Sequence, residues 1–182
     1  MKEIEIKAHA GNLAERARII AEVLGTEGSA VEKRDQYFRE PGAINQAFRM
    51  RNNNGNLEFT SKRMSKVGGF ENNFEFEFHA PMDQWDNAEA FFLNLGYERY
   101  FRKHKTGFEW YTEDGVHIEL FDVNDIGCYI EMEILADMDI TEDEVQEKNS
   151  RLIELLLAFG LHESDIEPTS YREMILAGNG EK

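Results

Sequence analysis

The chain has 182 residues, of which 41% are hydrophobic, and this predicts one globular domain over residues 1–178 with a frayed end at residues 179–182. The 20 Lys and Arg are outnumbered by 36 Asp and Glu, and the net charge of −16 argues against nucleic acid or an anionic membrane as a partner. The sequence has no apolar run suited to a signal peptide or a membrane span, which predicts a cytoplasmic location, and its one cysteine excludes an internal disulfide.

Strand and helix patterns follow one another in the first half of the chain. Alternating residues predict a strand over residues 3–8 (EIEIKA), and an apolar stripe predicts a helix over residues 13–24 that Gly25 ends. Further strands are predicted at residues 35–39, 47–52 and 57–63. The NNNGN segment between the last two is a hairpin signal, so these strands are expected to be antiparallel neighbours.

The second half of the chain shows the same two kinds of pattern. Strands are predicted at residues 73–80, 97–105, 116–123 and 128–135. Helices are predicted at residues 85–95, 141–159 and 171–176. The side of the first of these helices that carries Trp85, Ala88, Phe92 and Leu95 is expected to be buried, and Thr141 with Glu144 forms a capping box for the second.

A weak internal repeat indicates how these elements are arranged. EIEIKAHAGN precedes a helix that ends in VLG, and EFEFHAPMDQ precedes a helix that ends in NLG. Two similar units, each made of a strand, a helix and further strands, would close into a pseudo-symmetric barrel. We therefore predict an α+β fold, an eight-stranded antiparallel β-barrel with helices packed on its outside.

Charged residues alternate with apolar ones along most of the predicted strands. A single strand of this kind usually has its charged face in water, but here the apolar faces are those that amphipathic helices can cover. The charged faces would then line the interior of the barrel, where unpaired charge is unfavourable. The acids on these faces are Glu3, Glu5, Glu75, Glu77, Glu119, Glu131 and Glu133. The bases are Lys7, Arg49, Arg51, Lys62, Lys103 and Lys105.

Such an interior is stable if it is hydrated, if acids and bases alternate, and if ions fill it. Clustered carboxylate oxygens suit Mg²⁺ or Mn²⁺, whereas Arg and Lys suit phosphate oxygens. The two residue types together therefore indicate a metal-bound polyphosphate as the ligand.

The order of short motifs along the chain resembles one known family. EIEIK is similar to the N-terminal E-x-E-x-K signature of the CYTH family, also called triphosphate tunnel metalloenzymes, which includes class IV adenylyl cyclases, thiamine triphosphatases and inorganic tripolyphosphatases. The family's other motifs are matched in order by DQYF at 35–38, FRMR at 48–51, FTSK at 59–62, EFE at 75–77, KHK at 103–105, IEMEI at 130–134 and SY at 170–171.

This resemblance implies an antiparallel tunnel that holds a triphosphate on basic residues and one or two divalent ions on acidic ones. It implies metal-binding roles for Glu3, Glu5, Glu131 and Glu133, and catalytic roles for Lys7 and Glu5. The residues expected to bind phosphate are Lys7, Arg49, Arg51, Lys62, Lys103 and Lys105. Glu75 and Glu77 match the family's middle acidic pair, which binds metal or holds the basic side chains in place.

The sequence departs from the family pattern at two positions. Asn73 stands where the family usually has Arg, and Phe121 stands where it usually has Asp. Glu119 has the right parity to replace that Asp as a metal ligand, whereas Asp122 falls on the other parity. The second base of the KHK motif, Lys105, keeps its charge but lacks the bidentate fork of Arg.

Three functions remain open at this point. The first hypothesis is a class IV adenylyl cyclase-like enzyme that converts ATP to cyclic AMP and pyrophosphate with Mg²⁺ or Mn²⁺. The alternatives are a triphosphatase that acts on thiamine triphosphate, tripolyphosphate or a nucleoside triphosphate, and a binding protein without turnover. The five histidines are scattered, and only His117, which shares a face with Glu119, is a candidate for a role in the site. Spare apolar surface on the helices suggests a homodimer.

Overall fold

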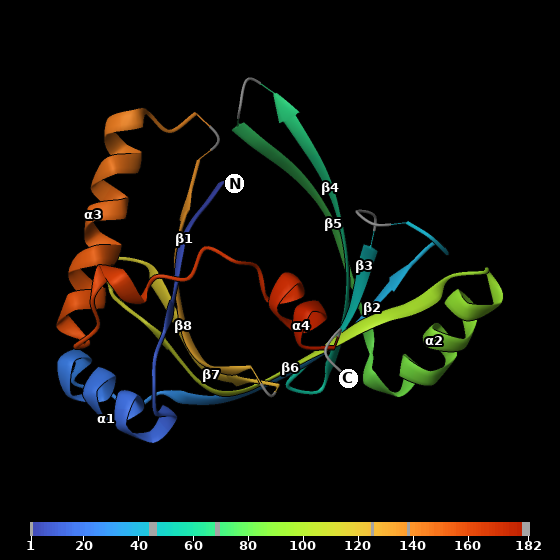
Figure 1. Cartoon of the computed structure of the whole chain (residues 1–182), viewed down its shortest axis with the longest axis horizontal. Helices are drawn as coiled ribbons and strands as arrows, with labels where there is room; N and C mark the ends of the chain where they lie inside the picture. Colours follow the sequence, from blue (N-terminus) through green and yellow to red (C-terminus); the bar gives the residue numbers. More distant parts are fainter. Residues whose placement is uncertain (1, 44–46, 68–69, 125, 138, 180–182) are drawn as a thin grey trace. The chain divides into compact units, whose positions relative to one another are not determined.

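The computed structural model describes residues 2–43, 47–67, 70–124, 126–137 and 139–179, without the side chains of Lys2, residues 62–75 and Asn179. Within this part of the chain, a strand, a helix and three strands occur twice in succession, and further helices follow (Figure 1). The strands are β1 (Lys2–His9), β2 (Ser29–Arg39), β3 (Ala47–Asn53), β4 (Asn56–Val67), β5 (Phe70–Pro81), β6 (Glu98–Tyr111), β7 (Val116–Val123) and β8 (Gly127–Ala136). The α-helices are α1 (Leu13–Leu24), α2 (Trp85–Asn94), α3 (Glu142–Ala158) and α4 (Tyr171–Asn179).

The strands form one eight-stranded sheet in the order β1-β8-β7-β6-β2-β3-β4-β5, with antiparallel pairing. The predicted α+β class, the eight antiparallel strands and the four helices are therefore confirmed. β1 and β5 stand at the two ends of the strand order. The chain divides into two compact units: unit 1 comprises residues 1–31 and 105–178, and unit 2 comprises residues 32–104 and 179–182.

Two tight turns set the register of the hairpins. Asn54 and Gly55, between β3 and β4, have φ values of 48° and 86°, as a two-residue turn of the primed type requires. Gly115, between β6 and β7, has φ 82°. The first of these hairpins was predicted from the NNNGN segment, because Asn and Gly tolerate this backbone conformation better than other residues do.

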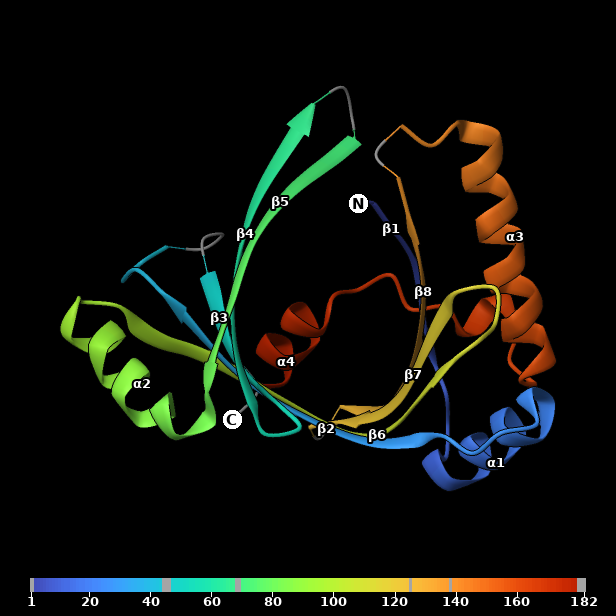
Figure 2. The ribbon, with the colours of Figure 1, turned by 180° about the vertical axis from the view of Figure 1, so that it is seen from behind.

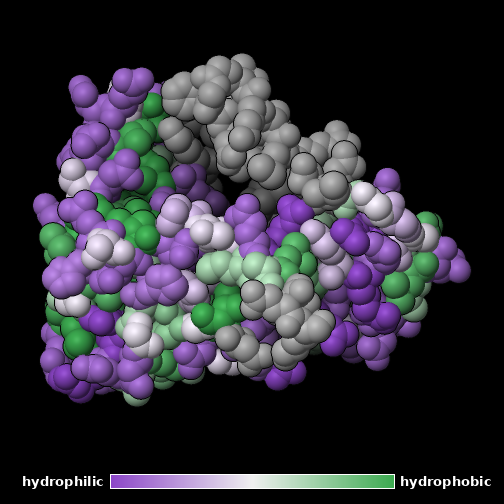
Figure 3. Space-filling view, viewed as in Figure 1, coloured by the Kyte–Doolittle hydropathy of each residue, from purple (hydrophilic) through white to green (hydrophobic). Residues whose placement is uncertain are grey.

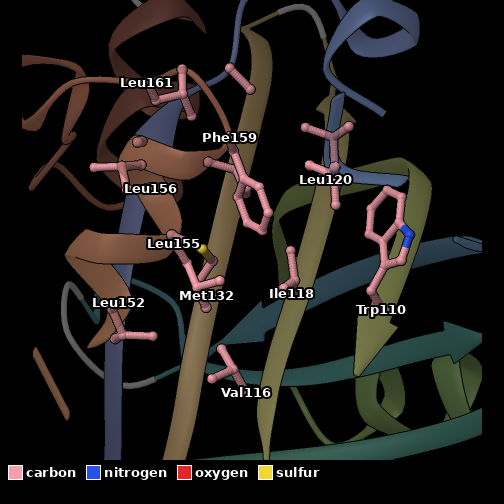
Figure 4. Close-up of a cluster of buried hydrophobic side chains, with 14 of the residues drawn as sticks. Trp110, Val116, Ile118, Leu120, Met132, Leu152, Leu155, Leu156, Phe159 and Leu161 are labelled. Atoms are coloured by element: carbon pink, nitrogen blue, oxygen red, sulfur yellow. The ribbon is translucent and has the colours of Figure 1, made fainter. Parts of the chain in front are cut away.

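The core of unit 1 lies between one face of its strands and the helices α1 and α3, which both ribbon views show beside β1, β7 and β8 (Figures 1 and 2). Ile118 and Leu120 from β7 and Met132 from β8 meet Leu156 and Phe159 at the end of α3, as Figure 4 shows. These side chains are fully buried. This is the apolar face that alternation predicted would be covered by helices.

The core of unit 2 lies between its strands and α2. Phe38, Met50 and Leu57 are fully buried, and the ring of Phe92 packs against Phe48 at 4.5 Å between centroids. The expectation that Leu95 lies on the buried side of this helix is wrong, because α2 ends at Asn94 and Leu95 is 57% exposed.

The caps of the helices agree with the sequence pattern. The Asn12 side chain accepts a hydrogen bond from the Glu15 N–H at the start of α1, and Thr141 with Glu144 forms the predicted capping box of α3. On the face shown in Figure 3, hydrophilic residues predominate over α2 and α3. Among the described residues, no helix has the length and apolar character needed to cross a membrane.

Candidate functional site

The charged face of unit 1 is built by four antiparallel strands whose register aligns the predicted site residues. Glu5 on β1 pairs with Glu133 on β8, and Lys7 pairs with Glu131. Glu131 in turn pairs with Glu119 on β7. Because side chains two residues apart share a face, these acids and bases lie on the face opposite the core. The predicted acidic cluster of Glu3, Glu5, Glu119, Glu131 and Glu133 is thus brought together on adjacent strands.

Glu5 lies among acids on this face. Partial burial, together with the carboxylates of Glu131, Glu133 and Glu3, raises the pKa of Glu5 to about 7, and Lys105 acts in the opposite direction. The side chain is nevertheless exposed at the surface of the face, so water screens part of this repulsion. A group of neighbouring carboxylates that raises the pKa of one of its members is the kind of site where a cation is expected to bind.

Two lysines and a tyrosine complete this face. The Lys105 ammonium donates to a Glu131 carboxylate oxygen and lies 3.9 Å from an oxygen of Glu119. The Lys7 ammonium donates to the Thr169 backbone carbonyl, and burial lowers its pKa. The ring of Tyr171, at the start of α4, lies 4.4 Å from Lys7 Nζ and 4.8 Å from Lys105 Nζ. Tyr171 therefore contacts both lysines of unit 1 that were predicted to bind phosphate.

His117 joins three acids on the same face. Its Nδ1 lies 3.1 Å from Glu133 Oε1, and its Nε2 lies 3.2 Å from Glu109 Oε2 and 3.8 Å from Glu119 Oε1. The pKa of His117 is raised: burial opposes the shift, and hydrogen bonding to Glu133 with the charge of Glu119 outweighs it. The shared parity of His117 and Glu119 therefore corresponds to a real contact.

On the charged face of unit 2, Arg51 and Lys103 surround the buried acid Asp35. The fully buried Asp35 carboxylate on β2 accepts from Arg51 Nε at 2.7 Å and from Arg51 Nη2 at 3.0 Å. Lys103 Nζ lies 3.3 Å from the same carboxylate. Lys103 and Arg51 hold the pKa of Asp35 well below its usual range against the effect of burial. Asp35 thus fixes two of the residues that were predicted to bind phosphate.

Arg49 lies beside this group and is held by two side chains of β4. Its Nη2 donates to Glu58 and, at 2.8 Å, to Thr60 Oγ1. Its buried Nε has no hydrogen-bond partner among the described residues, and so can donate to a ligand. Glu77 Oε2 lies 3.4 Å from Thr60 Oγ1, which fits the supporting role predicted for this acid. The side chains of Lys62 and Glu75 lie outside the described part, although their strand positions face each other across β4 and β5.

Several residues of these faces were not assigned a role from the sequence. They are Asp35, Glu58, Thr60, Glu109 and Tyr171. Asp35, Thr60 and Tyr171 lie inside motifs that resemble the family's, so the motifs contained the signal. Glu58 and Glu109 share parity with assigned bases and acids, but only strand pairing brings them within contact distance.

The family pattern's Asp has no direct counterpart on this face. Phe121 is fully buried there, with its ring centre 5.1 Å from Lys105 Nζ. Glu119, the predicted replacement, is 9% exposed and reaches the same lysine. The side chain of Asn73, the other departure, lies outside the described residues.

The donor set of unit 1 fits a divalent cation. Carboxylate oxygens from β1, β7 and β8 converge on one face, and oxygen ligands are those that Mg²⁺ and Mn²⁺ prefer. Burial and the neighbouring carboxylates raise the pKa of Glu5, and a bound cation would favour its ionised form. Glu5, Glu131 and Glu133 thus present carboxylates on the face that also carries Lys7 and Lys105, and the described residues of this face whose ligand atoms lie within 4.8 Å of one another are Glu109, His117 and Glu119.

Comparisons with known proteins agree with this architecture. A conserved hypothetical protein from Pyrococcus furiosus is 25% identical, with a TM-score of 0.73 over 96% of this chain and 100% of the other. An adenylate cyclase candidate from Vibrio parahaemolyticus is 19% identical, with a TM-score of 0.72 over 96% and 97% of the two chains.

A third similar structure is an adenylyl cyclase candidate from Hippeastrum that is described as having a dominant triphosphatase activity. It is 16% identical to this chain, with a TM-score of 0.65 over 97% and 96% of the two chains. At this identity, it and the Vibrio protein share the fold with this chain. A search of curated proteins finds no match. The model of the CYTH domain matches residues 1–171, and the chain therefore belongs to the CYTH domain family.

Proposed function

We propose that this chain is a divalent-metal-dependent enzyme that acts on a triphosphate substrate. The observation that carries the proposal is the face of unit 1, where an acidic cluster around Glu5 alternates with Lys7 and Lys105. On the same strands, carboxylates are suited to bind a cation and lysines are suited to bind phosphate oxygens. Family membership supports the same chemistry.

The residues of the site have complementary roles in this proposal. Glu3, Glu5, Glu119, Glu131 and Glu133 hold Mg²⁺ or Mn²⁺, which supplies positive charge to the phosphate oxygens. Lys7 orients the phosphate chain from β1, and Lys105 does so from β6. Arg49, Arg51, Lys62 and Lys103 are the proposed phosphate-binding bases of unit 2, and Glu75 and Glu77 support them. Lys7 and Glu5 are the proposed catalytic pair.

The first candidate reaction is cyclisation of ATP. The ribose 3′ hydroxyl attacks the α-phosphorus, loses its proton and displaces pyrophosphate, so that cyclic AMP forms. The protein's part is to fix the line of attack and to stabilise negative charge on the leaving group, which needs basic residues along the whole triphosphate. The Vibrio neighbour and the family resemblance support this candidate.

The second candidate reaction is hydrolysis of the terminal phosphate. Water attacks the γ-phosphorus, and the products are orthophosphate and a diphosphate. The same bases and carboxylates serve this reaction, because only the position of the nucleophile differs. The Hippeastrum neighbour, with its dominant triphosphatase activity, is the specific observation that favours it.

Product analysis distinguishes the two reactions. The purified chain is incubated with ATP, thiamine triphosphate or tripolyphosphate, each with Mg²⁺, Mn²⁺ or EDTA, and the products are separated by anion-exchange chromatography. Cyclic AMP with pyrophosphate supports the cyclase, and orthophosphate without cyclic AMP supports the triphosphatase. Tight binding of a triphosphate without product in any mixture would support the binding protein instead.

Matched variants test whether the turnover belongs to this site. Glu5→Ala and Lys7→Ala are expected to reduce turnover at least 100-fold. Glu147→Ala, at an exposed position on α3, is expected to leave it unchanged. Full activity of both site variants would contradict the proposal.

A homodimer, a cytoplasmic location and a single domain remain predictions of the sequence.

A further inference from the structure

Three potential metal ligands meet at one edge of the charged face of unit 1. They are Glu109 on β6 and His117 and Glu119 on β7, and one ligand atom from each lies within 4.8 Å of the others. Glu109 and Glu119 are direct partners in the β6 and β7 pairing. His117 lies two residues from Glu119 on the same strand and so on the same face. The hairpin itself therefore brings the three side chains together.

The imidazole of His117 is held from both sides. Its strand partner Tyr111 stacks on it, with ring centroids 4.3 Å apart and the planes 2° from parallel. Its other strand partner, Glu133, contacts Nδ1 at 3.1 Å. Nε2 is consequently directed at Glu109 and Glu119. A carboxylate on one ring nitrogen that orients the other nitrogen toward a cation is the usual support of a metal-binding histidine.

The spacing of the ligand atoms fits a cation without movement of the backbone. A first-row metal with bonds of about 2.1 Å places neighbouring ligand atoms about 3 to 3.5 Å apart. Nε2 lies 3.2 Å from Glu109 Oε2 and 3.8 Å from Glu119 Oε1. The three side chains are 21%, 17% and 11% exposed, in the order Glu109, His117 and Glu119, so water can reach the cluster and fill further positions.

From these observations we propose that Glu109, His117 and Glu119 form a cation site that takes Mn²⁺ or another first-row transition metal in preference to Mg²⁺. An imidazole nitrogen binds such metals well, whereas Mg²⁺ prefers an environment of oxygen ligands alone. In this assignment Glu133 orients His117 and is not a ligand of this cation, whereas the proposed function places Glu133 among the ligands of the metal that accompanies the substrate. The inference rests on the proposed function only in that Glu119 belongs to both sets of ligands.

The test measures metal binding in the absence of any triphosphate. The metal-stripped full chain is titrated with Mn²⁺, and free Mn²⁺ is followed by its electron paramagnetic resonance signal. Pulsed measurements on the bound ion then detect coupling to a nitrogen nucleus. We expect a bound Mn²⁺ with imidazole nitrogen coupling, and we expect Mg²⁺ to displace it only at a more than tenfold excess.

Variants of the three side chains complete the test. His117→Ala is expected to remove the nitrogen coupling and to weaken Mn²⁺ binding at this site at least tenfold. Glu109→Gln should weaken binding without removing the histidine, which controls for misfolding of the alanine variant. Glu133→Gln is expected to weaken binding about tenfold, as loss of an orienting carboxylate does. His104→Ala is the matched control, because His104 lies in unit 2, outside the cluster, and contacts the carboxylate of Glu32 at 2.8 Å.

Two outcomes would overturn the inference. One is bound Mn²⁺ without nitrogen coupling in the unmodified chain, which would mean that His117 only neutralises the surrounding acids. The other is unchanged Mn²⁺ affinity in both His117→Ala and Glu109→Gln. Failure of the proposed function has a different signature, namely no triphosphate turnover, and these binding measurements contain no substrate.

Discussion

At the scale of single residues, Asp35 shows how a buried charge is stabilised by charges of opposite sign. Asp35 is fully buried and is bound by both arms of Arg51 and by Lys103. Removal of one partner from such a group leaves uncompensated charge in a poorly hydrated site. Glu5 is the opposite case, because its neighbours include three acids. The two carboxylates are therefore expected to have opposite effects on stability.

Asp35→Asn should lower the free energy of unfolding by about 3 kcal/mol at pH 7, because it leaves Arg51 and Lys103 without their shared carboxylate. The folded pKa of Asp35 lies below its ordinary value of 3.8. Its contribution is therefore complete at pH 7 and is lost as the pH falls through 3.8 toward the lower folded pKa. Urea unfolding at pH 7 and at pH 3 measures both effects. Asp137→Asn, at an exposed site, should change little, and an equal loss in that control would contradict the argument.

Glu5→Gln should stabilise the metal-free chain at pH 8. The folded pKa of about 7 exceeds the ordinary value of 4.5, so ionisation of Glu5 costs stability as the pH rises from about 4.5 through 7. After allowance for screening at an exposed position, we expect a gain of about 1 kcal/mol at pH 8 and almost none at pH 4.5.

Urea unfolding in EDTA at the two pH values checks the effect of Glu5→Gln, with Glu147→Gln as the control. Addition of Mn²⁺ should reverse the order, because the unmodified chain keeps all its metal carboxylates. A gain that is the same at both pH values would show that the charge of Glu5 is not its cause.

At the scale of elements, the β6 and β7 hairpin sets the geometry of the charged face. It carries Lys105, Glu109, His117 and Glu119, and Gly107 lies against the backbone of Leu120 and Phe121 on β7. A Cβ atom on Gly107 would lie 1.9 Å from the Leu120 carbonyl oxygen, a distance that no side chain can adopt. This glycine allows the two strands to meet between Lys105 and Glu109.

Gly107→Ala is therefore expected to lower the free energy of unfolding by about 2 to 3 kcal/mol, because β6 must move away from β7. It should also weaken Mn²⁺ binding, since Glu109 and Glu119 are then displaced from each other. Chemical unfolding and Mn²⁺ titration provide the two measurements. Gly178→Ala is the matched control, because a Cβ there meets no atom within 4 Å. A Gly107→Ala variant as stable as that control would show that the close approach is not required.

At the scale of the whole molecule, the chain is acidic, but several of its basic side chains are grouped on the charged faces of the two units. Its net charge is −16, yet Lys7 and Lys105 are gathered on one face of unit 1, and Arg49, Arg51 and Lys103 on one face of unit 2. Carboxylates contact most of these bases. A ligand that combines divalent cations with phosphates supplies charges of both signs, and it should therefore stabilise the folded chain more than either ion alone.

Tripolyphosphate with Mn²⁺ is expected to raise the unfolding temperature by roughly 5 to 10 °C at a concentration 100 times its dissociation constant, which corresponds to about 2.7 kcal/mol. Differential scanning fluorimetry measures this shift. Tripolyphosphate with EDTA, and sulfate with Mn²⁺ at the same ionic strength, are the controls. An equal shift with sulfate would mean that general screening of charge is responsible and that no triphosphate site is involved.

The elements of the fold were largely predictable from the sequence because their signals are local. The alternation EIEIK indicates a strand with Ile4 and Ile6 on one face, and Asn54 with Gly55 indicates a tight turn. The end of α2 was less predictable, since Leu95 continues the apolar stripe of the helix beyond its last turn. Local signals specify which face a residue occupies, but they do not specify its neighbours on the adjacent strand.

The sequence by itself determined the family, the alternating faces and the acids and bases that share them, because each depends on spacing along one strand or on ordered motifs. Only the tertiary structure decided which of these residues touch. Strand pairing places Glu109 against Glu119, turns His117 toward both, and encloses Asp35 between Arg51 and Lys103. These contacts join residues up to 68 positions apart, from Asp35 to Lys103, and depend on register between strands, which no single segment encodes.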